Sequence, residues 1–191
     1  MGKQMQYSKR EALKLLGLGL AATGTIGLAR NAAAATAQQI NRDAEVALTT
    51  LYNSNAAAQS LGHEARGILV FPRIVKAGLM VGGAYGEGEL RKQGKPVAYY
   101  KSTAASFGMQ AGGQSFSYAL FLMSENAVNY LDRSDGWEIG VGPSIVVVDE
   151  GVARKMTTTT AREEIYAFIF GQKGLMAGLG LEGTKIARIK R

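Results

Sequence analysis

The chain has 191 residues, enough for one domain with a leader, and 47% of them are apolar, which allows a folded core. It contains no cysteine and a single histidine, His63. This composition excludes disulfides, thiol nucleophiles, thiolate metal sites and multi-histidine metal centres. The net charge is +7, but more than half of the surplus lies in residues 1–37, so the charge gives no reason to expect nucleic-acid binding.

The first 37 residues are predicted to be an export signal peptide. A basic segment precedes an apolar stretch over residues 15–29, and Ala35-Thr36-Ala37 matches the small-x-small pattern of a cleavage site. The apolar stretch is shorter than the about 20 residues that a transmembrane helix needs. We therefore expect cleavage after about Ala37 and an exported bacterial protein, periplasmic or peripherally associated with the envelope. A retained amphipathic or anchoring helix is the alternative.

Residues 8–14, SKREALK, also resemble the twin-arginine export motif, S-R-R-x-F-L-K. Glycines dilute the apolar stretch that follows, and Arg30 precedes the cleavage site; both features favour this route. Lys9 stands where the first arginine of the motif should be, and Ala12 stands where phenylalanine is usual. The twin-arginine and the general secretory routes therefore both stay open. The chain has no cysteine, so it has no lipoprotein attachment site.

Residues 38–60 are predicted to form an amphipathic helix. Its apolar residues recur at three- and four-residue spacings and form one stripe: Ile40, Ala44, Ala47, Leu48, Leu51 and Tyr52. The helix can dock on the domain's sheet or lie on a membrane surface. We favour docking, because the polar face is not rich in lysine and arginine.

From Gly67 onward the sequence predicts short strands separated by turns. The expected strands are residues 68–71, 79–90, 97–101, 115–123, 137–141, 145–148, 152–157 and 165–170. One short helix, Glu125–Arg133, interrupts them and has Ser124 as a candidate N-cap. Strands do not alternate with long helices, so a parallel doubly wound sheet is not expected. The predicted fold is α+β: a mainly antiparallel, strongly curved sheet or barrel-like body with an N-terminal amphipathic helix and one short internal helix.

Glycine is concentrated in FPRIVKAGLMVGGAYGEG, residues 71–88. In a strand over 79–90, Gly82, Ala84, Gly86 and Gly88 would share one nearly bare face, since alternate residues point the same way. Such a face admits another backbone, a helix or a flat ligand, and glycine also permits the bends and bulges that curve a sheet. We favour the architectural interpretation over a direct ligand role. A phosphate loop does not fit, because the order at 83–88 is GxxGxG and no helix follows.

No catalytic constellation is recognisable. His63 stands alone and the chain has no GxSxG, so a serine triad is not supported. The acids Asp132, Asp135, Asp149 and Glu150 are adequately explained as turn formers. The segment 132–136 lacks the spacing of a calcium loop. We expect no enzyme activity, no metal site and no cofactor.

Four blocks, in this order along the chain, resemble the SYLF domain, also called the Ysc84 actin-binding domain. They are Ala65–Gly83 with Gly86 and Gly88, Gly112–Met123, Gly140–Pro143, and Tyr166 followed by Gln172–Gly183. The motif glycines are Gly67, Gly78, Gly82, Gly83, Gly86, Gly88, Gly174, Gly178 and Gly183. The chain departs from the family pattern at Arg66, Leu79 and Tyr99–Ser102. Residues 38–191 are predicted to form this SYLF-like domain.

The resemblance implies binding without catalysis. Eukaryotic relatives bind phosphoinositide membranes and some bind actin; actin is not expected in a bacterial periplasm. An anionic lipid or membrane surface is therefore the implied partner, with Arg66, Arg73 and Lys76 as candidate head-group contacts by motif position. These three could equally be ordinary solvated charges. The alternatives are a structural or interaction module with an envelope protein partner and, on His63 alone, a hydrolase.

Overall fold

The computed structural model describes residues 35–78, 81–107, 112–133, 136–148, 163–174, 181 and 183–191. All described residues belong to one compact unit, Ala35–Arg191. The predicted strand 152–157, Leu79, Met80 and the motif residue Gly178 lie outside the described residues. So does nearly all of the predicted signal peptide, which stays a prediction together with its boundary.

Two helices, α2 (Ala37–Ser54) and α3 (Ala56–Glu64), replace the single helix predicted over 38–60. Asn55 separates them because its backbone is extended, and its side chain accepts a hydrogen bond from the amide of Ala58 at the start of α3. At the start of α2, Thr36 and Gln39 form a reciprocal capping box. The predicted apolar stripe is confirmed: all its members but Tyr52 are buried, and Tyr52 is half-buried.

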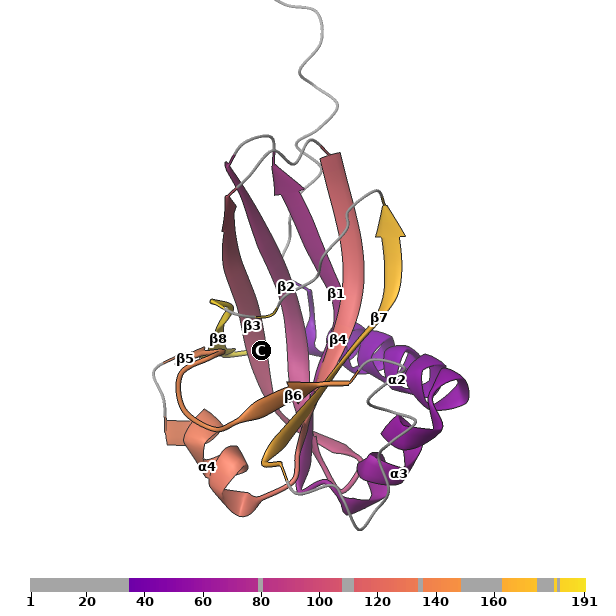
Figure 1. Ribbon diagram of the computed structural model, residues 1–191. Helices are drawn as coiled ribbons and strands as arrows, with labels where there is room; N and C mark the ends of the chain where they lie inside the picture. Colours follow the sequence, from indigo (N-terminus) through magenta and orange to yellow (C-terminus); the bar gives the residue numbers. More distant parts are fainter. Residues whose placement is uncertain are drawn as a thin grey trace, which may run out of the picture. The chain divides into compact units, whose positions relative to one another are not determined.

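The remaining elements form one curled sheet, seen in Figure 1, with the strand order β5-β8-β3-β2-β1-β4-β7-β6. Neighbouring strands are antiparallel except β6 and β7, which are parallel. Helix α4 spans Glu125–Arg133, as predicted, and Ser124 caps it through the amide of Ala127. The strands are β1 (Gly67–Gly78), β2 (Val81–Lys92), β3 (Lys95–Phe107), β4 (Gly112–Leu122), β5 (Trp137–Glu138), β6 (Ile145–Val147), β7 (Ile165–Gly174) and β8 (Lys185–Ile189). The expected α+β class with a curved, mainly antiparallel sheet is confirmed.

Several strands are longer than predicted. Strand β1 was expected to end at Phe71 but continues through Pro72 to Gly78. Proline has no amide to donate, and the chain accommodates it at an irregularity in the pairing of β1 with both of its neighbours. The strand predicted at 97–101 extends over Lys95–Phe107, whereas β5 keeps only two residues of the predicted 137–141.

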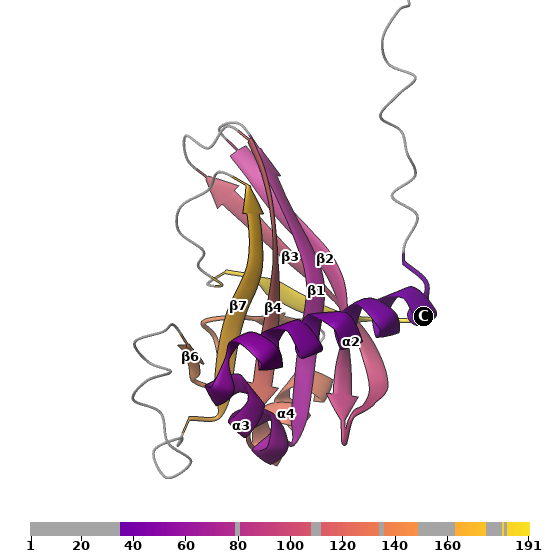
Figure 2. The ribbon, with the colours of Figure 1, turned by 90° about the vertical axis from the view of Figure 1, so that its right-hand side faces the viewer.

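Each face of the sheet carries its own core. On one face, here called the α4 face, Leu69, Phe71 and Leu120 pack with α4 and with the buried Trp137. On the opposite face, the α2 face, Val70 and Phe121 pack against α2 and α3. Figure 2 shows α2 lying across the sheet, while the far ends of β1 to β4 and β7 extend beyond it. The α2 face is therefore covered near one end of the long strands and open near the other.

Candidate lipid-binding surface

A line of irregularities crosses the sheet where it emerges from under α2. The register of β1 shifts between Val70 and Arg73 against β2, and between Phe71 and Ile74 against β4. The pairing of β4 with β7 shifts between Ser115 and Ser117. Ser117 connects the irregularity of β4 to that of β1, because its hydroxyl donates a hydrogen bond of 2.7 Å to the carbonyl oxygen of Pro72. Such bulges bend strands and increase their twist.

Two glycines of β2 are required beside this line, because the backbone of β1 passes very close to them. A Cβ on Gly88 would lie 2.1 Å from the carbonyl oxygen of Val70, and one on Gly86 would lie 2.4 Å from that of Arg73. At the hairpin between β1 and β2, a Cβ on Gly78 would lie 2.3 Å from the Cα of Gly82. No side chain fits at these distances, which gives these motif glycines the architectural role that we favoured.

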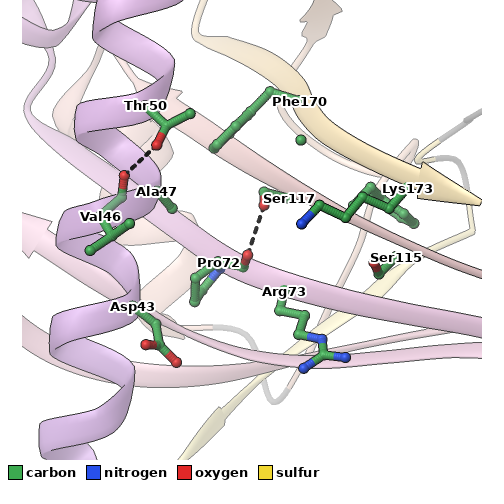
Figure 3. A pocket seen from close by; sticks show the side chains of 12 residues that line it. Asp43, Val46, Ala47, Thr50, Pro72, Arg73, Ser115, Ser117, Phe170 and Lys173 are labelled. Carbon is green, nitrogen blue, oxygen red and sulfur yellow. Dashed lines mark hydrogen bonds between the residues drawn. The ribbon is translucent and has the colours of Figure 1, made fainter.

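A groove of about 570 Å³ lies between α2 and the line of irregularities. Figure 3 shows side chains from α2, β1, β4 and β7 around it, with Lys173 extending over Ser117. Its polar lining consists of Asp43, Thr50, Arg73, Ser115, Ser117 and Lys173, and its apolar lining includes Val46, Pro72 and Phe170. The groove thus combines two cations with hydroxyl groups and an apolar wall.

The two cations of the groove are not engaged in ion pairs with other described residues. By contrast, the structure pairs Arg91 with Glu45 and with Glu89, Lys92 and Arg188 with Asp132, and Arg191 with Glu87. Both Arg73 and Lys173 are exposed, so their charges are available to a partner. Asp43 is the one acid on the lining and reduces the net charge of the groove to about one unit.

Beyond the groove, the open part of the α2 face is smooth and apolar. Val75 is 46% exposed, Val81 66% and Tyr85 50%. Val75 is paired with Tyr85, and Ala77 with Gly83, so these residues share one face of the β1–β2 hairpin with Arg73. The hydroxyl of Tyr85 donates to Glu87 at 2.6 Å, and this bond is the main reason why the pKa of Tyr85 is raised. We call Arg73, Val75, Ala77, Val81, Gly83, Tyr85, Ser115 and Lys173 the distal face.

The structure does not bring the three predicted head-group contacts together. Arg73 lies on the distal face. Lys76 pairs with Gln114 and follows Ile74 by two residues, so it belongs to the opposite, α4 face. Arg66 precedes β1 and lies seven residues before Arg73, about 23 Å away along the strand. It lines a second groove, of about 830 Å³, together with Glu45, Glu64, Arg91 and Lys92.

Sequence reasoning missed Lys173. It comes from β7, about one hundred residues after Arg73, and only the pairing of β4 with both β1 and β7 brings the two to one groove. Lys173 belongs to the glycine-rich block 172–183, which resembles a motif of the SYLF family. This resemblance is the feature of the sequence that could have identified Lys173 as a candidate.

The described residues hold neither a group of three metal-binding side chains nor a helix long and apolar enough to cross a membrane.

One family model matches the chain: Ysc84, described as Las17-binding protein actin regulator, over residues 103–190. No curated protein matches. The matched residues contain the blocks at 112–123, 140–143 and 166–183 and also Lys173, whereas the first block, 65–88, and Arg73 precede them. Over residues 103–190 this chain is thus similar to the Ysc84 family, the family that its glycine-rich blocks resemble.

Proposed function

We propose that this protein is a non-enzymatic, SYLF-like module of the bacterial envelope that binds anionic phospholipid membranes through its distal face. The observation that carries the proposal is the placement of Arg73 and Lys173, which form no ion pair with another described residue, on the same face of the sheet as exposed Val75 and Val81. The match to the Ysc84 family supports a binding role. The predicted leader supports export across the inner membrane of a bacterium, to a compartment where no actin is expected.

The expected affinity is modest. Two basic residues near an anionic surface contribute about 2 kcal/mol together, and salt screens this attraction. An apolar contribution must add to it, and full burial of a valine side chain contributes about 1.5 kcal/mol. The distal face therefore predicts peripheral binding with one part that responds to salt and one part that does not.

Co-sedimentation of the full chain with vesicles tests the proposal. Phosphatidylcholine vesicles are compared with vesicles that also contain phosphatidylglycerol, at low and high salt. We expect stronger binding to the anionic vesicles. The double variant Arg73→Glu/Lys173→Glu should bind them at least about 30-fold more weakly at low salt, since about 2 kcal/mol is lost.

The matched control is Lys95→Glu/Lys190→Glu, which changes the net charge equally at exposed positions away from the groove. A further variant, Arg66→Glu, tests the predicted contact that lies at the other end of β1. Equal losses in the control and the test variant would contradict the proposed surface. No binding by the unmodified chain, together with one stoichiometric protein captured from the envelope, would favour the alternative of an interaction module without lipid specificity.

A further inference from the structure

A carboxyl group is buried where α2 crosses β2. Glu89 is 0% exposed, although its neighbours on the same face of β2, Tyr85 and Arg91, reach solvent. Its position in the sheet is fixed by pairing with Val70 of β1 and Tyr99 of β3. The side chain of Asn41, from the first half of α2, lies directly over it. A negative charge on a carboxyl group without access to water costs free energy, because the charge loses its hydration.

The side chain of Asn41, from α2, contacts both Glu89 of β2 and Tyr99 of β3. With the Asn41 amide oriented by its surroundings, its nitrogen lies 2.5 Å from Glu89 Oε2, 2.9 Å from the Tyr99 hydroxyl and 2.9 Å from the Ala37 carbonyl, and its two hydrogens are shared among these three acceptors. Glu89 Oε1 lies 3.5 Å from Arg91 Nε, and neither of these two buried atoms has a hydrogen-bond partner among the described residues. The carboxyl group is therefore incompletely satisfied in its ionised form.

The Arg91 guanidinium is also shared with other groups. It forms an ion pair with Glu45 of α2 and donates to the carbonyl of Gly94 at 2.7 Å. Because Arg91 is divided among these partners, it neutralises Glu89 only in part. We call Asn41, Glu45, Glu89, Arg91 and Tyr99 the Glu89 cluster.

We propose that the Glu89 cluster is a proton-dependent latch, which holds α2 firmly on the sheet while Glu89 is neutral and loosens it when Glu89 ionises. The latch controls whether the apolar stripe of α2 stays buried. It does not depend on lipid binding, since every group in it belongs to the docked helix and the sheet beneath.

The charges around the cluster set the direction of the effect. Burial raises the pKa of Glu89 to about 7; Arg91 opposes this rise and Glu45 adds to it. The other titratable groups that face the cluster are Tyr52 of α2, Tyr99 of β3 and His63 of α3, which lines the adjoining groove with Arg91. Glu87 faces the start of α2, where it accepts from the amide of Ala35 and pairs with Arg191.

The sign follows from linkage. When α2 is undocked, Glu89 meets water and ionises near its usual value, about 4.3. When α2 is docked, it keeps its proton up to about pH 7. Docking is therefore strongest below the ordinary carboxyl pKa, weakens as the pH rises to about 7, and changes little above that.

Hydrogen exchange of the full chain, without lipid, tests the latch. Protection factors of the α2 amides, corrected for intrinsic exchange, are compared at about pH 5 and about pH 8. We expect protection to fall by at least about tenfold and by as much as roughly 100-fold, since two pH units separate pH 5 from the titration near 7. In Glu89→Gln, which keeps the shape and carries no charge, protection should be the same at both pH values.

Three further variants make the result specific. Glu138→Gln removes an exposed carboxylate from β5 and His63→Gln removes the one histidine; both should keep the fall seen in the unmodified chain. Glu45→Gln removes a charge that raises the pKa of Glu89, so the fall should become smaller and its midpoint should move to lower pH. This variant gives an answer even where Glu89→Gln does not fold. Protection of α2 that is independent of pH in the unmodified chain, or a full fall in Glu89→Gln, would overturn the proposal.

Discussion

At Gly88, the structure has no room for even one additional carbon atom. Strand β1 passes so close to it that a methyl group would lie 2.1 Å from a backbone carbonyl oxygen, and no rotation of a side chain can relieve that contact. We expect Gly88→Ala to lower the free energy of unfolding by about 3 kcal/mol, the upper part of the range for overpacking. Urea denaturation measures the change. The matched control is Gly113→Ala in β4, where nothing lies within 4 Å of the added Cβ and the change should stay within about 0.5 kcal/mol. Similar losses at both positions would contradict this account of the glycines.

For single residues, the sequence predicts which apolar side chains are buried, but not which residues contact one another. The spacing of Ile40, Ala44 and Leu48 was sufficient to predict the buried side of α2, because a helix repeats every 3.6 residues. Glu89, by contrast, was not singled out by any sequence pattern. It is buried because α2 covers that part of the face, and no pattern within β2 contains this information.

Helix α2 illustrates how much an element depends on its first residues. Thr36 accepts from the amide of Gln39, and the Gln39 side chain accepts from the amide of Thr36. Thr36→Ala should therefore destabilise α2 by about 1 kcal/mol, the usual cost of losing such a cap. Hydrogen exchange of the α2 amides measures this, with Thr49→Ala as the control, since Thr49 is exposed in the helix interior and alanine is the better helix former there. A greater loss of protection in the control than in Thr36→Ala would show that the cap is unimportant.

The boundaries of elements were predicted less well than their existence. Asn55 lies inside the single helix that was predicted over residues 38–60, but two helices are present. The strand predicted over 68–71 stopped before Pro72, yet β1 continues, because a bulge leaves one residue without a ladder partner and a proline can occupy that position. In both cases the type of element was predicted correctly. Its end was not, because the ends depend on contacts with neighbouring elements.

For the molecule as a whole, the succession of short strands was enough to predict an antiparallel, curved sheet, but not the order of its strands. Strand β8 lies beside β3, and β7 beside β4, through pairings between residues far apart in the sequence. The groove depends on these pairings, since Arg73 and Lys173 meet only across β4. This is why the first glycine-rich block yielded Arg73 but not its partner cation.

The distal face predicts two separable components of membrane binding. At high salt the contribution of Arg73 and Lys173 is screened, and the remaining binding should depend on Val75 and Val81.

The double variant Val75→Thr/Val81→Thr tests this dependence, because it keeps β-branched side chains of almost the same shape but makes them polar. Binding of this variant to anionic vesicles at high salt should fall by about tenfold, which corresponds to about 1.4 kcal/mol of lost apolar burial. The matched control, Val97→Thr/Val141→Thr, alters two valines that are similarly exposed, at 48% and 60%, outside the distal face. If the control variant lost as much binding, apolar contact would not be confined to the distal face. If the unmodified chain itself did not bind at high salt, the charges alone would hold the protein on the membrane.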